Sequence, residues 1–162
     1  MTRSLTVTWE NPFATFEAGK KLATPLEYMR AIRDGRLPAP PIAKLISMDL
    51  VEVDEGKAVF QITPAEQHYN PIGVVHGGIA FTMLDSAMGC CVQTMLPAGK
   101  GYTTLEMKAN LVRAITLKTG PIRAIGKIVH MGRQTATAEG RIEDSQGKLY
   151  AHGTTTCIIL SP

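Results

Sequence analysis

The segment at residues 77–96 constrains the fold of this chain more than any other feature. It contains no proline, and apolar side chains recur on nearly every side of the helix that it is expected to form. A helix that is apolar all round is a buried helix, so the rest of the chain has to enclose it. These apolar residues are Ile79, Phe81, Met83, Leu84, Met88, Cys91, Val92 and Met95.

The residues after this helix have the pattern of β-strands. Residues 104–111 place polar side chains at even positions and apolar ones at odd positions, which predicts a strand with one buried face. Residues 134–143 alternate in the same way, and residues 120–131 and 148–160 complete a set of four strands with a turn at 144–147. Short connections favour mostly antiparallel pairing. The side chains expected on the buried face of the first strand are Leu105, Met107, Ala109 and Leu111.

Two further strands are predicted before the helix, at residues 43–53 and 57–62, joined by a tight turn at 54–56. Residues 63–75 contain two prolines and a glycine and are expected to form a loop. The order is therefore two strands, one helix and four strands. It predicts an α+β fold in which a mostly antiparallel sheet of about six strands wraps around a long buried helix.

The chain begins with residues 1–41, whose pattern predicts a helical N-terminal extension. Asn11 is a candidate cap for a short helix. Thr24 and Glu27 have the spacing of a capping box at the start of a second helix. Gly35 is a plausible end of that second helix, because glycine favours the position after the last helical turn.

A proline-rich stretch at residues 37–41 separates this extension from the main domain at residues 42–162, because it can continue neither helix nor sheet. With 162 residues, of which 44% are hydrophobic and 19% charged, the chain has the size and apolar content of one globular domain. This composition excludes a disordered tail, a collagen-like repeat and a long coiled coil.

The net charge of +3 is too small to favour nucleic acid as a partner. The charges are unevenly distributed: residues 1–99 carry eight basic and ten acidic groups, whereas residues 100–162 carry nine and four. The second part of the chain is therefore expected to meet an anionic ligand. No run approaches the ~20 apolar residues of a membrane helix, and the first ten residues lack the apolar run of a signal peptide, so no membrane partner is expected.

Cysteine and histidine predict neither a disulfide framework nor a metal site. Cys90, Cys91 and Cys157 are expected to be reduced, buried thiols, which favours a cytoplasmic location. The histidines have no ligand-like pairing with a cysteine or a carboxylate, so no metal is expected. They are His68, His76, His130 and His152.

Residues 70–78, with the sequence NPIGVVHGG, lead into the start of the central helix. A helix N-terminus offers unpaired N–H groups and the positive end of the helix dipole. Glycines at positions 77 and 78 allow a ligand oxygen to approach these donors, as in an oxyanion hole. The alternative is a turn of two glycines with a capping histidine, His76.

Asp85 is the only carboxylate in the central helix. It lies beside a narrow, weakly polar stripe in an otherwise apolar segment, and no Lys or Arg is close to it in sequence. A partly buried carboxylate in this setting is a candidate catalytic group. The alternative is a solvated aspartate at the surface.

Residues 70–78, in the pattern N-x-x-G-x-x-H-G-G, followed by Asp85, resemble the phenylacetic-acid-degradation (PaaI-like) branch of the hotdog-fold acyl-CoA thioesterases. The predicted order of strands and helix matches that fold as well. The resemblance covers roughly residues 42–160 and leaves the helical extension outside. It implies an enzyme that hydrolyses a thioester to a free acid and coenzyme A, with no metal or redox cofactor.

The resemblance also implies roles for individual residues. Asp85 is similar to the carboxylate that acts as nucleophile or as base for water, and the Gly77 N–H to the donor that polarises the thioester carbonyl. His76 shapes the turn around that donor. Asn70 is similar to an asparagine that helps to place the water or the carbonyl, and Thr104 to a residue that orients water.

Gly132, Arg133 and Gln134 resemble the turn at which this family meets the phosphates of coenzyme A. The excess of basic residues in the second part of the chain agrees with this assignment. The partners expected are therefore an acyl-CoA substrate and further copies of the same chain, as a homodimer and then a homotetramer.

Helix geometry gives an independent reason to expect a dimer. Gly77 and Asp85 are eight residues apart, so they lie about 12 Å apart along a helix axis. Both groups have to act within ~3 Å of one thioester, so each site is expected to combine Gly77 of one chain with Asp85 of another. Two alternative functions remain: a hotdog hydratase or dehydratase, and a non-catalytic module that binds acyl-CoA or an aromatic ligand.

Overall fold

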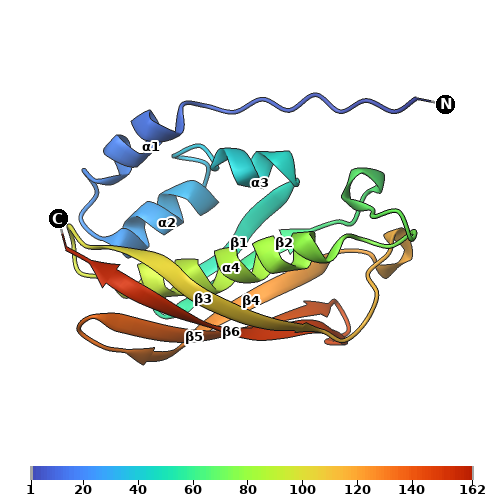
Figure 1. Cartoon of the computed structure of the whole chain (residues 1–162). Coiled ribbons are helices and arrows are strands. Elements are labelled where there is room, and N and C mark those ends of the chain that lie inside the picture. The colour runs from blue at the N-terminus through green and yellow to red at the C-terminus, as the bar shows by residue number, and fades with distance from the viewer. Residues whose placement is uncertain (1, 162) are drawn as a thin grey trace.

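The computed structural model describes residues 2–161, in which a six-stranded antiparallel sheet curls around one long helix (Figure 1). The predicted α+β architecture and the predicted order of strands and helix are confirmed. The helices are α1 (Pro12–Gly19), α2 (Pro25–Arg33), α3 (Pro41–Leu45) and α4 (Gly77–Gln93), with short 3₁₀ turns at Glu66–His68 and Leu117–Thr119. The strands are β1 (Met48–Asp54), β2 (Lys57–Ile62), β3 (Gly101–Leu111), β4 (Ile122–Met131), β5 (Thr135–Asp144) and β6 (Leu149–Leu160).

The strands lie in the order β1-β2-β4-β5-β6-β3, and each neighbouring pair is antiparallel. The chain therefore crosses the sheet twice. Helix α4 connects β2 to β3 at the far edge, and the segment after β3 returns to β4 in the middle. Within the described residues β3 pairs only with β6, so its other side is a free edge.

Glycines allow the sheet to approach α4 closely. A Cβ atom at Gly126 on β4 would lie 2.1 Å from the carbonyl oxygen of Ala87, and one at Gly140 on β5 would lie 2.8 Å from Cγ of Met88. Both distances are below van der Waals contact, so the sheet backbone packs against the helix backbone at Gly126 and against a helix side chain at Gly140. The core side chains of α4, including Met83, Leu84 and Met88, are fully buried against this surface.

We predict that Gly126→Ala destabilises the fold more than Gly140→Ala. The new methyl group at Gly126 meets rigid helix backbone, whereas the one at Gly140 meets a flexible methionine side chain. The expected loss of unfolding free energy is about 3 kcal/mol at Gly126 and about 1 kcal/mol at Gly140, the two ends of the range for overpacked cores. Urea unfolding of both variants measures this free energy. Equal losses of stability in the two variants would contradict this account of the packing.

Helices α1, α2 and α3 lie on the side of α4 away from β5 and β6 (Figure 1). The predicted caps at Asn11 and Thr24 are confirmed, but the reciprocal half of the capping box is not, because the Glu27 carboxylate accepts from the Ala23 N–H and not from the Thr24 N–H. The side chain of Asn11 accepts hydrogen bonds at the start of α1, and Thr24 Oγ1 accepts one from the Glu27 N–H, 3.1 Å away, at the start of α2. Helix α2 ends at Arg33, and Gly35 follows with φ +71°.

The predicted strand at residues 43–53 is wrong at its N-terminal end. Pro41, expected to end a rigid linker, is the first residue of α3, a position that suits proline because its fixed φ is helical and no N–H is needed there. Ser47 then adopts φ 52°, a left-handed backbone conformation that separates α3 from β1, which begins at Met48.

Two expectations of burial are wrong for the single chain. Leu105 and Leu111 on β3 are exposed, because the pairing with β6 shifts register between Thr104 and Glu106 and the strand lies at the sheet edge. One face of α4 is also exposed, including Phe81. The predicted alternation on β5 is confirmed, with Ala136, Ala138, Gly140 and Ile142 buried.

Candidate active site

The start of α4 carries a free hydrogen-bond donor. His76 is the N-cap, and its Nδ1 accepts a hydrogen bond from the Gly78 N–H at 2.8 Å, so the capping histidine considered from the sequence is present. The cap therefore satisfies the N–H of Gly78. The N–H of Gly77, the first helical residue, has no partner within the helix. A Cβ atom at Gly77 would lie 2.8 Å from Cδ1 of Leu111, so the position has little room for a side chain.

The loop before α4 is organised by Asn70. Its Oδ1 accepts hydrogen bonds from the N–H groups of Ile72, at 3.1 Å, and Val74, at 3.2 Å. The side-chain Nδ2 of Asn70 is left as a donor. The loop is fixed to the helix start by a hydrogen bond of 2.8 Å from the His76 N–H to the carbonyl of His68. Sequence reasoning missed the role of His68, because a backbone carbonyl leaves no signal in the residue type.

A pocket of about 300 Å³ brings three of the predicted site residues together: Asn70, His76 and Gly77. Leu111, at the end of β3, lines the same pocket. The donor at the helix N-terminus therefore opens into a space large enough for part of a ligand.

Asp85 lies further along α4 and is exposed in the single chain, so the expectation that it is partly buried is wrong. The reason is the free edge at β3, beyond which no part of the described chain covers this helix face. The Thr104 hydroxyl donates a hydrogen bond of 3.0 Å to Asp85 Oδ1. This contact fixes the orientation of the carboxylate and leaves Oδ2 available.

The structure thus places the predicted site residues in two groups. Asn70, His76 and Gly77 line one pocket, and Asp85 with Thr104 forms a second group. Asp85 lies eight positions after Gly77 on the helix, which separates the two groups by about 12 Å along its axis. One chain alone does not bring them together.

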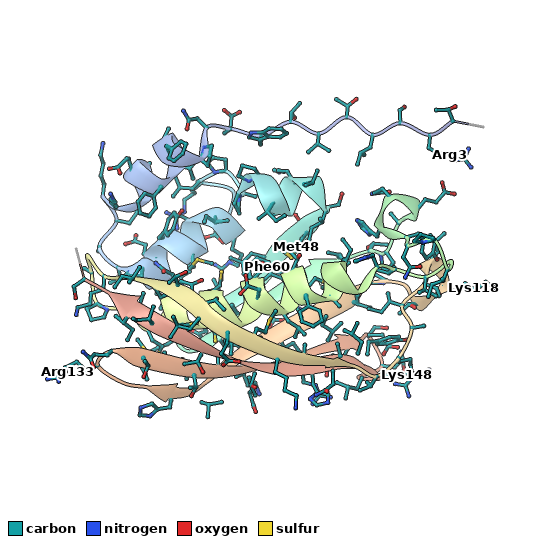
Figure 2. The ribbon with its side chains drawn as sticks, viewed as in Figure 1. Arg3, Met48, Phe60, Lys118, Arg133 and Lys148 are labelled. Atoms are coloured by element: carbon teal, nitrogen blue, oxygen red, sulfur yellow. The ribbon has the colours of Figure 1, made fainter. Side chains whose placement is uncertain are left out.

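The hairpin between β4 and β5 holds the remaining predicted residues. The Gly132 N–H donates to the carbonyl of Thr135 at 2.9 Å, and the Ile159 N–H donates to the carbonyl of Gln134 at 2.8 Å. Arg133 is exposed at the tip, at the end of the sheet opposite Lys148 (Figure 2).

The register of the sheet places this hairpin near the Asp85 group. Thr104, which contacts Asp85, pairs with Cys157 on β6, and Cys157 pairs with Ala136 on β5. Arg133 is only three residues before Ala136, about 10 Å along an extended chain. The hairpin and the Asp85 group therefore lie toward the same end of the sheet.

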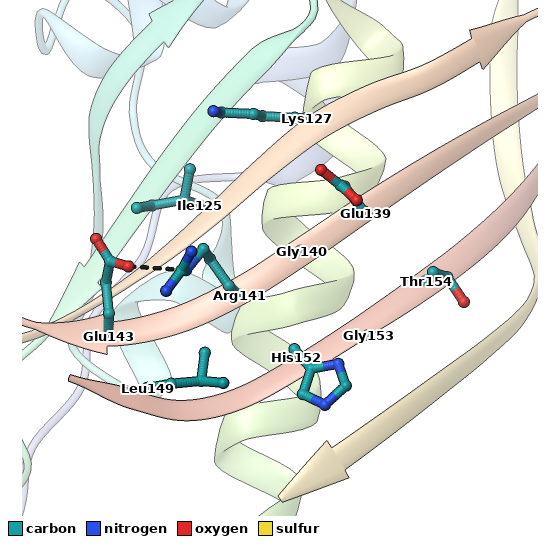
Figure 3. Close-up of a pocket in the computed structure, with 10 residues that line it drawn as sticks. All are labelled: Ile125, Lys127, Glu139, Gly140, Arg141, Glu143, Leu149, His152, Gly153 and Thr154. Carbon is teal, nitrogen blue, oxygen red and sulfur yellow. Dashed lines mark ion pairs between the residues drawn. The ribbon is translucent and has the colours of Figure 1, made fainter. Parts of the chain in front are cut away.

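Other features of the molecule lie outside these two groups. A pocket of about 460 Å³ lies on the outer face of the sheet and contains none of the predicted site residues; its Arg141 and Glu143 form an ion pair of 2.8 Å (Figure 3). Among residues 2–161 no cluster of three His, Cys, Asp or Glu side chains could hold a metal ion, and none of the helices there is long and apolar enough to cross a membrane.

The three cysteines are free thiols, as predicted. Cys91 and Cys157 are buried, and Cys90 on α4 is half-buried. Burial raises the pKa of both Cys90 and Cys91 to about 12, so these thiols are protonated at neutral pH and are poor nucleophiles.

Comparisons with known proteins agree with this geometry. Residues 72–151 match the thioesterase superfamily. Acyl-coenzyme A thioesterase PaaI of Escherichia coli is 29% identical over 110 residues, 67% of this chain and 75% of that protein. The 1,4-dihydroxy-2-naphthoyl-CoA hydrolase of Listeria monocytogenes is 27% identical over 108 residues, 67% of this chain and 86% of that protein.

A solved structure with the same fold is a putative thioesterase, a phenylacetic acid degradation-related protein from Ralstonia eutropha. It superposes with a TM-score of 0.72 at 26% identity and covers 81% of this chain and 98% of its own. The order of the sheet, the central helix and the matched residues lead to one conclusion: residues 72–151 belong to the thioesterase superfamily, and the chain is a PaaI-like hotdog-fold thioester hydrolase.

Proposed function

We propose that this protein is an acyl-CoA thioesterase that needs no metal or redox cofactor. The observation that carries the proposal is the arrangement on α4, where a free N–H at Gly77 opens into a pocket and an oriented carboxylate at Asp85 lies on the exposed face. Hydrolysis of a thioester requires a donor for the carbonyl oxygen and a group that attacks or activates water. Free thiols and a coenzyme A ester as substrate favour a cytoplasmic location.

In the proposed reaction the Gly77 N–H donates to the thioester carbonyl oxygen, and the Asn70 Nδ2 donates to that oxygen or to water. As a base, Asp85 Oδ2 accepts a proton from water, the resulting hydroxide adds to the carbonyl carbon, and the C–S bond breaks. The proton then passes to the departing thiolate. As a nucleophile, Asp85 Oδ2 adds to the carbonyl carbon, and the C–S bond breaks to give an anhydride and coenzyme A thiolate. Water then cleaves the anhydride to the free acid and the Asp85 carboxylate, and its proton passes to the thiolate. Thr104 orients the carboxylate in either route.

The proposal includes a second copy of the chain, because Gly77 and Asp85 lie too far apart to act on one carbonyl. The surface beside Asp85 suits such a partner. Phe81 on α4 and Leu105 on β3 are exposed apolar side chains, 36% and 58% accessible, next to a free strand edge. Helices from two copies in opposite directions would bring Gly77 of one beside Asp85 of the other. The outer face of the sheet is left free to join two dimers into a homotetramer.

The test is release of free coenzyme A from a panel of acyl-CoA esters, followed with a thiol reagent. Steady release with matching amounts of free acid supports the thioesterase. A hydratase would change the acyl group and leave the thioester intact, and a binding module would retain the ester without turnover. Either result would overturn the proposed function.

Arg133 is proposed to contact the phosphates of coenzyme A, with Gly132 and Gln134 shaping its turn. We predict that Arg133→Ala raises KM for acyl-CoA about 5- to 10-fold with kcat within about 2-fold, because a phosphate contact is equally strong in ground and transition states. Arg36→Ala is the control, since Arg36 is an exposed arginine after α2 that belongs to neither group of site residues. Acyl esters of a phosphate-free thiol should show no loss. An equal loss with them would make Arg133 a structural residue.

A further inference from the structure

The helical extension and the main domain enclose a pocket of about 600 Å³. Phe16 and Leu22 line it from α1 and the segment after it, and Tyr28 lines it from α2. The opposite wall comes from Tyr102 at the start of β3 and Leu160 at the end of β6. Aromatic and aliphatic side chains supply most of its surface, and its polar lining residues are Lys20, Thr24, Gln93 and Lys100. The volume suits a small apolar group. Tyr102 lies within residues 72–151, which match the thioesterase superfamily, whereas the residues from the helical extension lie outside them.

One wall of the pocket, at Tyr102, lies near the Asp85 group. Tyr102 and Thr104 are two residues apart on β3 and precede the register shift, so their side chains lie on the same face of the sheet, about 7 Å apart. Thr104 contacts Asp85 directly. The Tyr102 hydroxyl lies over Gly89, where a Cβ atom would be only 2.6 Å from it, one helical turn after Asp85.

A strip on α4 connects the carboxylate to the pocket. Ser86, Cys90 and Gln93 are half-buried and lie four and three residues apart, so they share one side of the helix. Gln93 lines the pocket itself. Cys90 is a protonated thiol, with its pKa raised by burial to about 12, and therefore adds a nearly apolar surface midway along the strip.

The geometry points to this pocket as the site for the far end of the substrate's acyl group, so that the N-terminal extension selects apolar acyl groups longer than about six carbons. This inference rests on the proposed thioesterase function. A hydrocarbon chain with C–C bonds of about 1.5 Å advances roughly 1.3 Å per carbon, so about five or six carbons span the 7 Å between the Asp85 group and Tyr102. Shorter acyl groups would not reach the extension.

We predict that Leu22→Trp, which fills the pocket, lowers kcat/KM for decanoyl-CoA at least ~10-fold and for butanoyl-CoA less than ~2-fold. The measurement is thiol release across straight-chain esters of two to sixteen carbons, with phenylacetyl-CoA as an aromatic arm. That arm shows whether the pocket takes chains, rings or both. Ala98→Phe fills the same pocket from the loop after α4 and serves if Leu22→Trp fails to fold.

Two phenylalanines on α1 provide a matched pair. Phe16 lines the pocket, whereas Phe13 is 79% exposed and does not. Phe16→Ala should lower the decanoyl-to-butanoyl ratio of kcat/KM at least ~10-fold, the low end of the range for a lost apolar contact in a pocket, and Phe13→Ala should leave it unchanged.

The outcomes separate the two proposals. If butanoyl-CoA is hydrolysed normally and the filled variants keep the wild-type chain-length profile, the thioesterase stands and the assignment of this pocket is wrong. Equal losses at every chain length would make Leu22 and Ala98 structural and also overturn the assignment. If the wild-type protein hydrolyses no acyl-CoA ester, the proposed function fails and the acyl pocket with it.

Discussion

Replacing Asp85 by asparagine should lower kcat for acyl-CoA hydrolysis at least ~100-fold, the size expected for loss of an acid–base group or nucleophile. Asparagine keeps the shape of the side chain and can still accept the hydrogen bond from Thr104 through its carbonyl oxygen. The side chain is exposed, so folding should be unaffected. Thiol release measures kcat, and urea unfolding measures stability.

The matched control is Asp49→Asn, which makes the same change at an exposed position on β1, away from both groups of site residues. It should retain wild-type turnover. If Asp85→Asn also retains it, the catalytic carboxylate lies elsewhere and the proposed mechanism is wrong.

Mixing two inactive variants should restore activity to roughly a quarter of wild type, if each site is shared between two chains. The variants are Asp85→Asn and Gly77→Pro, in which proline removes the N–H that position 77 contributes. Random pairing at equal input makes half of the dimers mixed. Each mixed dimer has one site with both defects and one site with neither.

Both variants first have to be shown to fold and to assemble, because proline at position 77 could disturb the contact with Leu111. Two distinguishable tags on the variants allow the mixed dimers to be purified and assayed directly. If purified mixed dimers are as inactive as the parents, Gly77 and Asp85 act within one chain and the shared site is wrong.

The sequence predicted those parts of the fold that depend on local periodicity. The alternation at residues 135–142 and the caps at Asn11 and Thr24 hold in the structure, because each depends only on neighbours a few residues away. The strand expected from residue 43 does not, because proline at position 41 and the left-handed backbone at Ser47 together favour a short helix. Neither effect is visible in hydrophobic periodicity.

The candidate site was predictable at the start of α4, where His76 and Gly77 are adjacent in sequence and their geometry follows from helix capping. The exposure of Asp85 was not predictable, because it depends on which strand forms the sheet edge. The acyl pocket depends on contacts between residues as distant as Phe16 and Leu160, and no pattern along the sequence indicates a contact of that kind.

The unpaired edge of β3 has a consequence for how the protein behaves at low concentration. This 11-residue strand has an open row of N–H and C=O groups and two exposed leucines, Leu105 and Leu111. Such an edge promotes nonspecific aggregation when nothing covers it. If a second copy covers it, apparent thermal stability should rise with protein concentration, because association favours the folded state by mass action. Dilution below the dissociation constant would then uncover the edge and abolish catalysis together, since the contact that covers the edge also completes the site.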